Sequence, residues 1–104
     1  MDLNAILENC QGFQWDKGNS LKSWLKHSVT RGETEQIFFN EPLLLLEDKK
    51  HSEYENRFLA LGRTDEGRYL FVAFMVRDHW IRIISARNMN KKERDDYEKI
   101  ETNT

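Results

Sequence analysis

The sequence predicts an α+β fold, in which an antiparallel sheet of four to five strands carries two N-terminal helices and one C-terminal helix. Three observations predict this fold. The apolar pattern changes after Pro42 from the spacing of helices to the alternation of strands. Helix-capping residues stand at Asp16, Thr30 and Asn90. The chain of 104 residues has the size of one domain.

The N-terminal elements are short. Residues 1–12 are expected to form a leader of mixed polarity with one loose helical turn, and residues 13–15 alternate as in a strand. Asp16 is expected to cap a helix that runs to about His27. The apolar face of that helix carries Leu21, Trp24 and Leu25.

A second helix is predicted from Thr30 to about Phe39. Thr30 and Glu33 have the spacing of a capping box. Pro42 ends this element, because the residue before a proline is pushed out of the helical region.

The second half of the chain is predicted to supply most of the sheet. The expected strands are separated by a charged loop at 48–53 and by turns, and they cover residues 43–47, 54–63, 68–76 and 80–87. Asn90 opens a closing helix to about Lys99. The domain is therefore expected to span residues 13–100, with a tail at 101–104.

Several classes of protein are excluded by composition. No apolar run approaches the roughly 20 residues that a membrane-spanning helix needs. The N-terminus lacks the basic start and apolar stretch of a signal peptide. A single cysteine, Cys10, excludes a disulfide framework and a cysteine-based zinc site. We therefore expect an intracellular, cytoplasmic protein that does not contact a membrane.

Charge is unevenly distributed along the chain. Residues 57–94 hold nine Lys and Arg against four Asp and Glu, whereas the rest holds seven against fourteen. Most of the nine are arginines, whose planar guanidinium suits phosphate. This asymmetry indicates a polyanionic partner, although a solvated sheet face would carry charge as well.

Most patterns of metal or phosphate chemistry are missing. His27, His51 and His79 lie far apart in sequence, so no metal and no cofactor are predicted. No glycine-rich loop or nucleophile elbow is present. Residues 67–74 partly match the aromatic strand of RRM domains, but the order of elements does not fit that fold.

The strand predicted at 80–87 combines arginines with β-branched residues. Strict alternation would place Ser85 and Arg87 on one face, and Arg82 with Ile84 on the other. Such arginines line a groove, or they pair with an acid such as Glu55, Glu47 or one of the last helix. Both interpretations stay open at this level.

A set of motifs in a fixed order resembles the BrnT-type toxin family. The resemblance covers residues 13–98, and the start at 13–16 together with the strand at 81–87 makes it specific. Its pieces are Phe13-Gln14-Trp15-Asp16, Lys26-His27, residues 38–43, residues 55–63, Gly67-Arg68, residues 81–87, Glu93-Arg94 and Tyr97-Glu98.

The resemblance implies a RelE-like fold and a toxin of a type II toxin–antitoxin pair, with residues 13–100 as the BrnT-like toxin domain. It also implies a metal-independent endoribonuclease that cleaves RNA and inhibits translation and growth. The expected partner is a cognate antitoxin of the ribbon-helix-helix DNA-binding type. The toxin would contact DNA only through this antitoxin.

Cleavage of RNA without a metal needs a base, a cation for the phosphorane and an acid. We assign the cationic role to Arg57, Arg82 and Arg87. His27 is the preferred acid or base, with Tyr97 as the fallback proton donor. Residues expected to contact substrate are Lys26, Arg63, Ser85, Lys91 and Lys92. An equally good interpretation of His27 is a histidine that favours the C-terminal end of its helix.

The chain departs from the family pattern at three places, of which the acidic last helix, together with the sequence pI of about 5.9, favours an alternative function. The leader is extra, Ser28 stands where the family has glycine, and the last helix carries Asp95 and Asp96. The alternative is a catalytically weak or inactive module that acts by binding an antitoxin. Its anchor residues would be Trp24, Trp80 or Met89, unless these side chains pack in the core.

Overall fold

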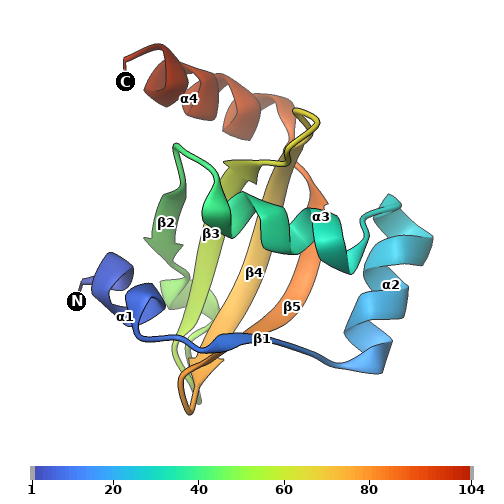
Figure 1. Ribbon diagram of the computed structural model, residues 1–104, viewed down its shortest axis with the longest axis vertical. Coiled ribbons are helices and arrows are strands. Elements are labelled where there is room, and N and C mark those ends of the chain that lie inside the picture. Colours follow the sequence, from blue (N-terminus) through green and yellow to red (C-terminus); the bar gives the residue numbers. More distant parts are fainter. Residues whose placement is uncertain (1, 104) are drawn as a thin grey trace.

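The computed structural model describes residues 2–103, which form one five-stranded sheet with helices around it (Figure 1). The strand order is β1-β5-β4-β3-β2. The strands are β1 (Gly12–Trp15), β2 (Leu44–Glu47), β3 (Arg57–Arg63), β4 (Tyr69–Arg77) and β5 (Trp80–Asn88).

Four α-helices accompany the sheet: α1 (Leu3–Glu8), α2 (Lys17–His27), α3 (Arg31–Gln36) and α4 (Lys91–Thr102). Two short 3-10 turns are η1 (Ile37–Phe39) and η2 (Lys49–His51). The predicted caps are confirmed, because Asp16, Thr30 and Asn90 each accept a backbone N–H of the helix that they precede.

The prediction of an α+β fold is confirmed, but the sheet is mixed and not purely antiparallel. β1 pairs with β5 in parallel, with Gly12 opposite Trp80 and Trp15 opposite Ile83. The reason is the long connection after β1, since a crossover allows two strands to run in the same direction where a hairpin does not. The other pairs, β2–β3, β3–β4 and β4–β5, are antiparallel.

The expectation of two N-terminal helices is also corrected, because the leader contains a third, α1. Asp2 caps α1 by accepting hydrogen bonds from the amides of Asn4 and Ala5. Leu3, Ile6 and Leu7 then pack against the core. The RelE-like character of the fold stays a prediction of the family resemblance.

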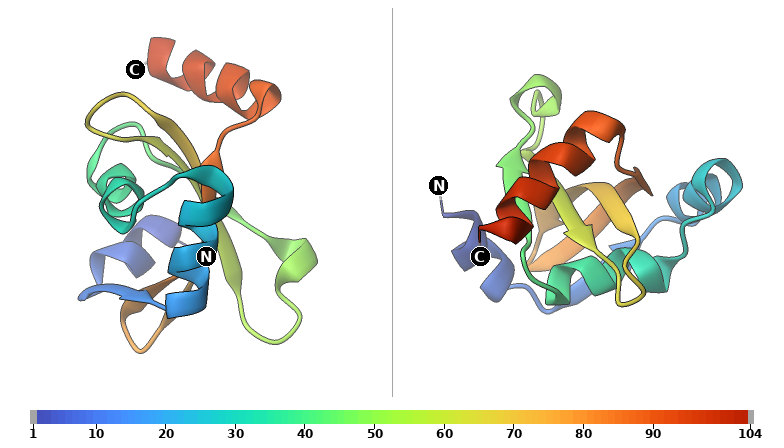
Figure 2. Two further views of the ribbon diagram at one scale, coloured as in Figure 1. Left: turned by 90° about the vertical axis from the view of Figure 1, so that its right-hand side faces the viewer. Right: turned by 90° about the horizontal axis from the view of Figure 1, so that it is seen from above.

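The core lies between the sheet and the helices α1 and α3 with η1, which cover the same face (Figure 2). It is built from alternate residues of the three central strands: Phe58, Ala60, Leu70, Val72, Phe74, Ile81, Ile83 and Ala86. Ile37 of η1 completes it, with no exposed surface. The opposite face carries the charged residues of β3 and β5.

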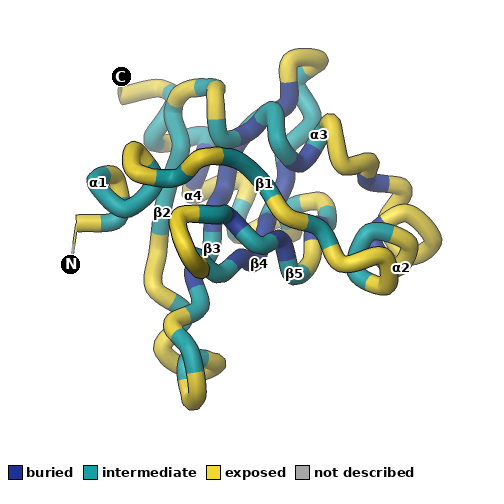
Figure 3. The backbone as a smooth tube through the Cα atoms, turned by 60° about the horizontal axis from the view of Figure 1, so that its bottom comes forward, coloured by how far each residue is buried: buried dark blue, intermediate teal, exposed yellow. Residues whose placement is uncertain are grey.

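Helix α2 stands beside the edge of β5 and buries little (Figures 1 and 3). Its only buried residue is Ser23, whose hydroxyl accepts the amide of Ala86, while Asn19 donates to the carbonyl of Ile83. Small polar side chains thus bind the edge of β5 from Ile83 onward, where the pairing with β1 ends. Leu21, Trp24 and Leu25, expected on an inward apolar face, are therefore turned to solvent.

No helix within residues 2–103 is long and apolar enough to cross a membrane.

Candidate functional site: an arginine-bearing sheet face

A β-bulge in β5 decides which side chains share the open face of the sheet. Met75 of β4 is opposite Arg82, and Ala73 is opposite Ser85, so Ile84 is an extra residue in β5. An extra residue in one strand shifts the alternation of everything that follows. Arg82, Ser85 and Arg87 therefore project from one face.

This arrangement corrects the prediction that Arg82 lies on the opposite face from Ser85 and Arg87. The same face also holds Arg57, which is opposite Met75, and Arg63, which is opposite Tyr69. One surface thus brings together the three arginines proposed for phosphate binding and two of the proposed substrate contacts.

Arg57 and Arg82 form one cross-strand row with Met75 between them, and we name them the open arginine pair. Their Cα atoms are two strand spacings apart, about 10 Å, which two arginine side chains bridge easily. Neither guanidinium has a hydrogen bond or an ion pair to another residue of the described chain. The Nε of Arg57 is buried without a partner, an uncommon state for a polar atom.

A second arginine group, at the other end of the face, is neutralised by α4. Arg87 donates to both carboxylate oxygens of Glu93, at 2.8 and 2.9 Å, and its guanidinium lies 4.0 Å from the centre of the Phe71 ring. These hydrogen bonds from Arg87 hold the pKa of the Glu93 carboxyl below its usual value. Arg63 donates to Glu101 at 2.9 Å. The ion pair of Arg87 with Glu93 is the expected contact with an acid of the last helix.

Tyr97 is fully buried beneath α4. Its ring packs edge-on against Tyr69, and its hydroxyl donates to the carbonyl of Pro42. Burial raises the pKa of Tyr97 to about 12. The hydroxyl is therefore protonated at neutral pH and is occupied within the fold.

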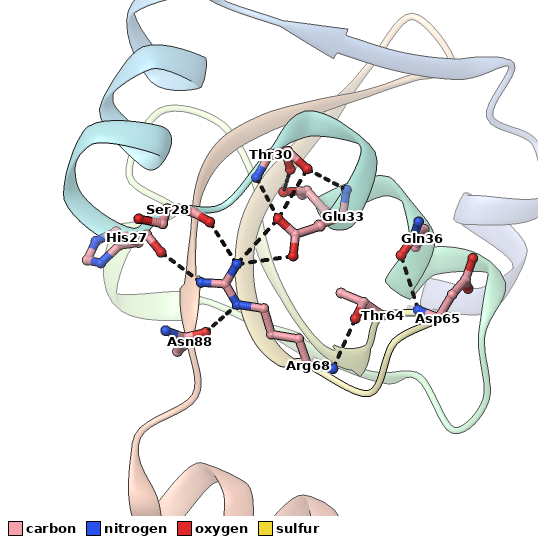
Figure 4. A network of polar contacts seen from close by, with 10 residues as sticks. His27, Ser28, Thr30, Glu33, Gln36, Thr64, Asp65, Arg68 and Asn88 are labelled. Carbon is pink, nitrogen blue, oxygen red and sulfur yellow. Dashed lines mark hydrogen bonds and ion pairs between the residues drawn. The ribbon is translucent and has the colours of Figure 1, made fainter.

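His27 lies at the end of α2, on the same side as Asn88 at the end of β5 (Figure 4), and Lys26 precedes it in the last turn of the helix. The carbonyls of His27 and Ser28 accept hydrogen bonds from Arg68, whose Nε also donates to Asn88. The His27 imidazole points away from Arg68 into solvent (Figure 4). Arg82 is six residues before Asn88, or about 20 Å along an extended strand, so the structure does not bring His27 to the open arginine pair.

The remaining candidates, Lys91 and Lys92, occupy the first turn of α4 and are exposed. Lys92 pairs with Asp96 at 3.3 Å. A surface pair of this kind leaves the lysine available to solvent and contributes little to stability.

Three features of the site were missed at the sequence level. Arg77 beside the open arginine pair is fixed by two hydrogen bonds to Glu55, at 3.0 and 2.8 Å. Arg68 is a structural clamp, which the family motif marked without giving its role. The bulge at Ile84 had no signal in the sequence, because a β-branched residue in a strand suggests regular alternation.

No group of three or more His, Cys, Asp or Glu side chains within residues 2–103 is arranged to hold a metal ion.

Fold and site together define a small α+β protein whose open sheet face carries a row of arginines, side chains that suit anionic ligands. The family model for the ribonuclease toxin BrnT of type II toxin–antitoxin systems matches residues 15–93, and the chain belongs to this family. No curated protein matches the chain. Among solved structures, the ribonuclease toxin BrnT of Brucella abortus has a similar fold, with a TM-score of 0.60 and 17% identity. The match covers 77% of this chain and 97% of that chain.

Proposed function

We propose that this member of the family is a metal-independent endoribonuclease whose catalytic centre is the open arginine pair. One observation carries the proposal: Arg57 and Arg82 face each other across Met75 with no carboxylate bound to either guanidinium in the described chain, and the Nε of Arg57 is buried without a partner. Guanidinium groups that no carboxylate occupies are suited to bind a phosphate.

The pair would act on the phosphate. When the 2′-hydroxyl oxygen attacks phosphorus, negative charge builds on the phosphoryl oxygens. The bond to the 5′-oxygen then breaks, and that oxygen takes a proton from solvent water. Two fixed guanidinium groups stabilise that charge, and arginine does so without changing its own protonation. Arg87, already bound to Glu93, would hold a neighbouring phosphate less tightly.

We assign Glu55 as the base that accepts the proton of the 2′-hydroxyl. The hydrogen bonds from Arg77 lower the pKa of Glu55, and the charge of Arg82 acts in the same direction, so the carboxylate is ionised at neutral pH. His27 and Lys26 lie too far from Arg82 to share its phosphate, and we assign them to a flanking nucleotide. Tyr97 receives a structural role.

The test is RNA cleavage by the purified chain with and without a chelator. Arg57→Ala and Arg82→Ala should each lower the rate by about 10²–10³-fold, as the loss of a transition-state donor does. Arg31→Gln removes one guanidinium outside this face and serves as the matched control. Cleavage that stops with the chelator, or that survives both alanine substitutions, contradicts the proposal.

In cells we expect RNA loss, arrest of translation and arrest of growth, all reversed by the antitoxin encoded beside this chain. The proposed antitoxin is a ribbon-helix-helix protein, so DNA would be contacted through it, and the pair would act in the cytoplasm. Induction of the chain alone and together with the antitoxin, followed by growth and bulk RNA integrity, measures all of this.

A second candidate function is that of a weak or inactive module that binds an antitoxin. The observation that favours it is the neutralisation of Arg87 by Glu93 and of Arg63 by Glu101. Well-folded protein that forms the antitoxin complex and yet leaves RNA intact would support this function over the first.

A further inference from the structure

The outward face of α2 is an apolar stripe that the rest of the fold does not cover. Leu21 is 57% exposed, Trp24 52% and Leu25 71%. At about 100° per residue, Leu21 and Leu25 both point roughly 160° away from the buried Ser23. The stripe therefore lies at the centre of the solvent face of the helix, where side chains that only pack would not remain uncovered.

Positive charge borders the stripe at one end and on one flank. Lys17 points in nearly the same direction as Trp24, two turns before it at the N-terminal end of the stripe, and Lys22 stands on the flank beside Leu25, both exposed. Helix α2 contains no acidic residue, and the preceding Asp16 is engaged as its N-cap. Arg31 adds a further charge beside the helix, where its Nε donates to Ser20 and its guanidinium lies 5.6 Å from the centre of the Trp15 ring.

We infer that the stripe of Leu21, Trp24 and Leu25 is a docking surface for an acidic amphipathic helix of the antitoxin. A helix with leucines at three- and four-residue spacing would cover the stripe, and its flanking Glu and Asp would meet Lys17 and Lys22. RNA is the less suitable occupant, since two outward leucines offer nothing to phosphates. This inference rests on the proposed function only in naming the antitoxin as the partner.

The surface is separate from the arginine-bearing face. Helix α2 lies beside the edge of β5, and its stripe points away from the sheet, whereas the open arginine pair projects from the face between β3 and β5. An antitoxin helix on α2 would thus hold the toxin without occupying the open arginine pair, and the rest of the antitoxin would have to block that face.

The first experiment uses the full chain and two labelled synthetic peptides of roughly four helical turns, about 15 residues each. Both carry the same leucines at helical spacing, one with Glu and the other with Lys at all flanking positions. We expect fluorescence anisotropy to give at least tenfold tighter binding of the acidic peptide, weakened by salt. Equal binding of both peptides, or binding of neither, overturns the inference.

Variants locate the binding. Leu21→Gln with Leu25→Gln keeps helix propensity and charge, and should weaken acidic-peptide binding at least tenfold. Lys17→Gln with Lys22→Gln should weaken it about threefold at low salt. Leu46→Gln, at an exposed leucine on β2, is the matched control. Unchanged binding to the double leucine variant, or binding lost equally in the control, overturns the assignment to α2.

The antitoxin itself supplies the last measurement. The double leucine variant should resist neutralisation by the antitoxin while it cleaves RNA as the wild type does. Normal neutralisation, or a parallel loss of RNA affinity, overturns the inference and, in the second case, makes α2 a contact for RNA. A wild-type chain that cleaves no RNA contradicts the proposed function alone, because the peptide measurements do not depend on cleavage.

Discussion

Arg82 and Arg87 lie five residues apart on β5 and project from the same face of the sheet, because Ile84 between them is an extra residue. Their surroundings differ. The Arg82 guanidinium has no hydrogen-bond or ion-pair partner within residues 2–103, whereas Arg87 is bound by both oxygens of Glu93. The same strand thus presents one available and one occupied guanidinium.

Glu93→Gln tests that difference. Glutamine preserves the capping box with Asn90 and removes the negative charge that occupies Arg87. We expect RNA to bind a few-fold more tightly, since one more cation becomes available for phosphate. Filter binding at two salt concentrations measures this effect, and Lys92→Gln is a control on the same helix. Weaker RNA binding by Glu93→Gln would contradict the role assigned to Arg87.

The same variant should change the response to acid. The folded pKa of Glu93 is lowered by Arg87, so the carboxylate stabilises the fold above its unfolded pKa of about 4.3 and loses this contribution as pH falls through the folded pKa. The free energy of unfolding of the wild type should exceed that of the variant by about 1 kcal/mol at neutral pH. The difference is small because the ion pair is partly exposed. Urea titrations from pH 7 to pH 3 should show the gap closing, and a constant gap would refute this account.

Arg68→Lys tests the clamp at the end of α2. The guanidinium donates hydrogen bonds to four residues at once, which a lysine ammonium with three donors cannot do. These residues are His27, Ser28, Glu33 and Asn88. We expect a loss of about 1–3 kcal/mol in the free energy of unfolding. Arg94→Lys, at an exposed pair with Glu98, should cost less than about 0.5 kcal/mol in the same denaturant titration. Equal losses would show that the clamp has no special role.

Tyr97→Phe separates a structural tyrosine from a proton donor. The variant leaves the carbonyl of Pro42 without its partner, and we expect a loss of about 1–2 kcal/mol in stability with RNA cleavage unchanged. Tyr69→Phe, whose hydroxyl donates to Glu101 at 3.1 Å, is the matched control. A large loss of cleavage by stable Tyr97→Phe protein would restore the catalytic assignment.

An alkaline titration adds a second readout for Tyr97. Its folded pKa, about 12, exceeds the unfolded value of about 10. Its contribution to stability is therefore complete below about pH 10 and declines as pH rises above that value. The wild type should lose stability faster than Tyr97→Phe between pH 10 and pH 12.

Ser28→Gly is expected to stabilise the fold. Ser28 ends α2 in the left-handed region, with φ 54° and ψ 38°, where glycine has no steric penalty. The gain should be about 0.5–1 kcal/mol, partly offset by the greater freedom of glycine in the unfolded chain. Thermal melts measure it, with Ser20→Gly inside the same helix as a control that should destabilise. A destabilised Ser28→Gly protein would contradict the observed backbone geometry.

The elements of the fold were predictable because their signals are local. Capping side chains at Asp16, Thr30 and Asn90 act within one helical turn, and Gly67, in the turn before β4, has a positive φ of 89°, which glycine adopts without penalty. The parallel pairing of β1 with β5 was not predictable, because it depends on a contact between the two ends of the chain.

The candidate site was predictable in its residue types and not in its geometry. Arg57 and Arg82 were both assigned to phosphate binding, and they share a face because each lies opposite Met75, whereas the bulge at Ile84 brings Ser85 and Arg87 to the same face. The prediction that the apolar side chains of α2 point into the core was wrong for a different reason. Helical periodicity reports which side chains are apolar, and it does not report whether the helix meets a sheet face or, as at Ser23, a sheet edge.

The parallel pairing of β1 with β5 also bears on the order of synthesis. β1 is made before the other four strands of the sheet, and its partner residues 80–83 follow more than 60 residues later. Closing the loop over that separation costs conformational entropy. This cost is offset only by contacts with β5, which is in place once the hairpin of β4 and β5 has formed. A nascent chain that stops before Trp80 therefore lacks the strand with which β1 pairs, and the five-stranded sheet forms only after β5 has been made.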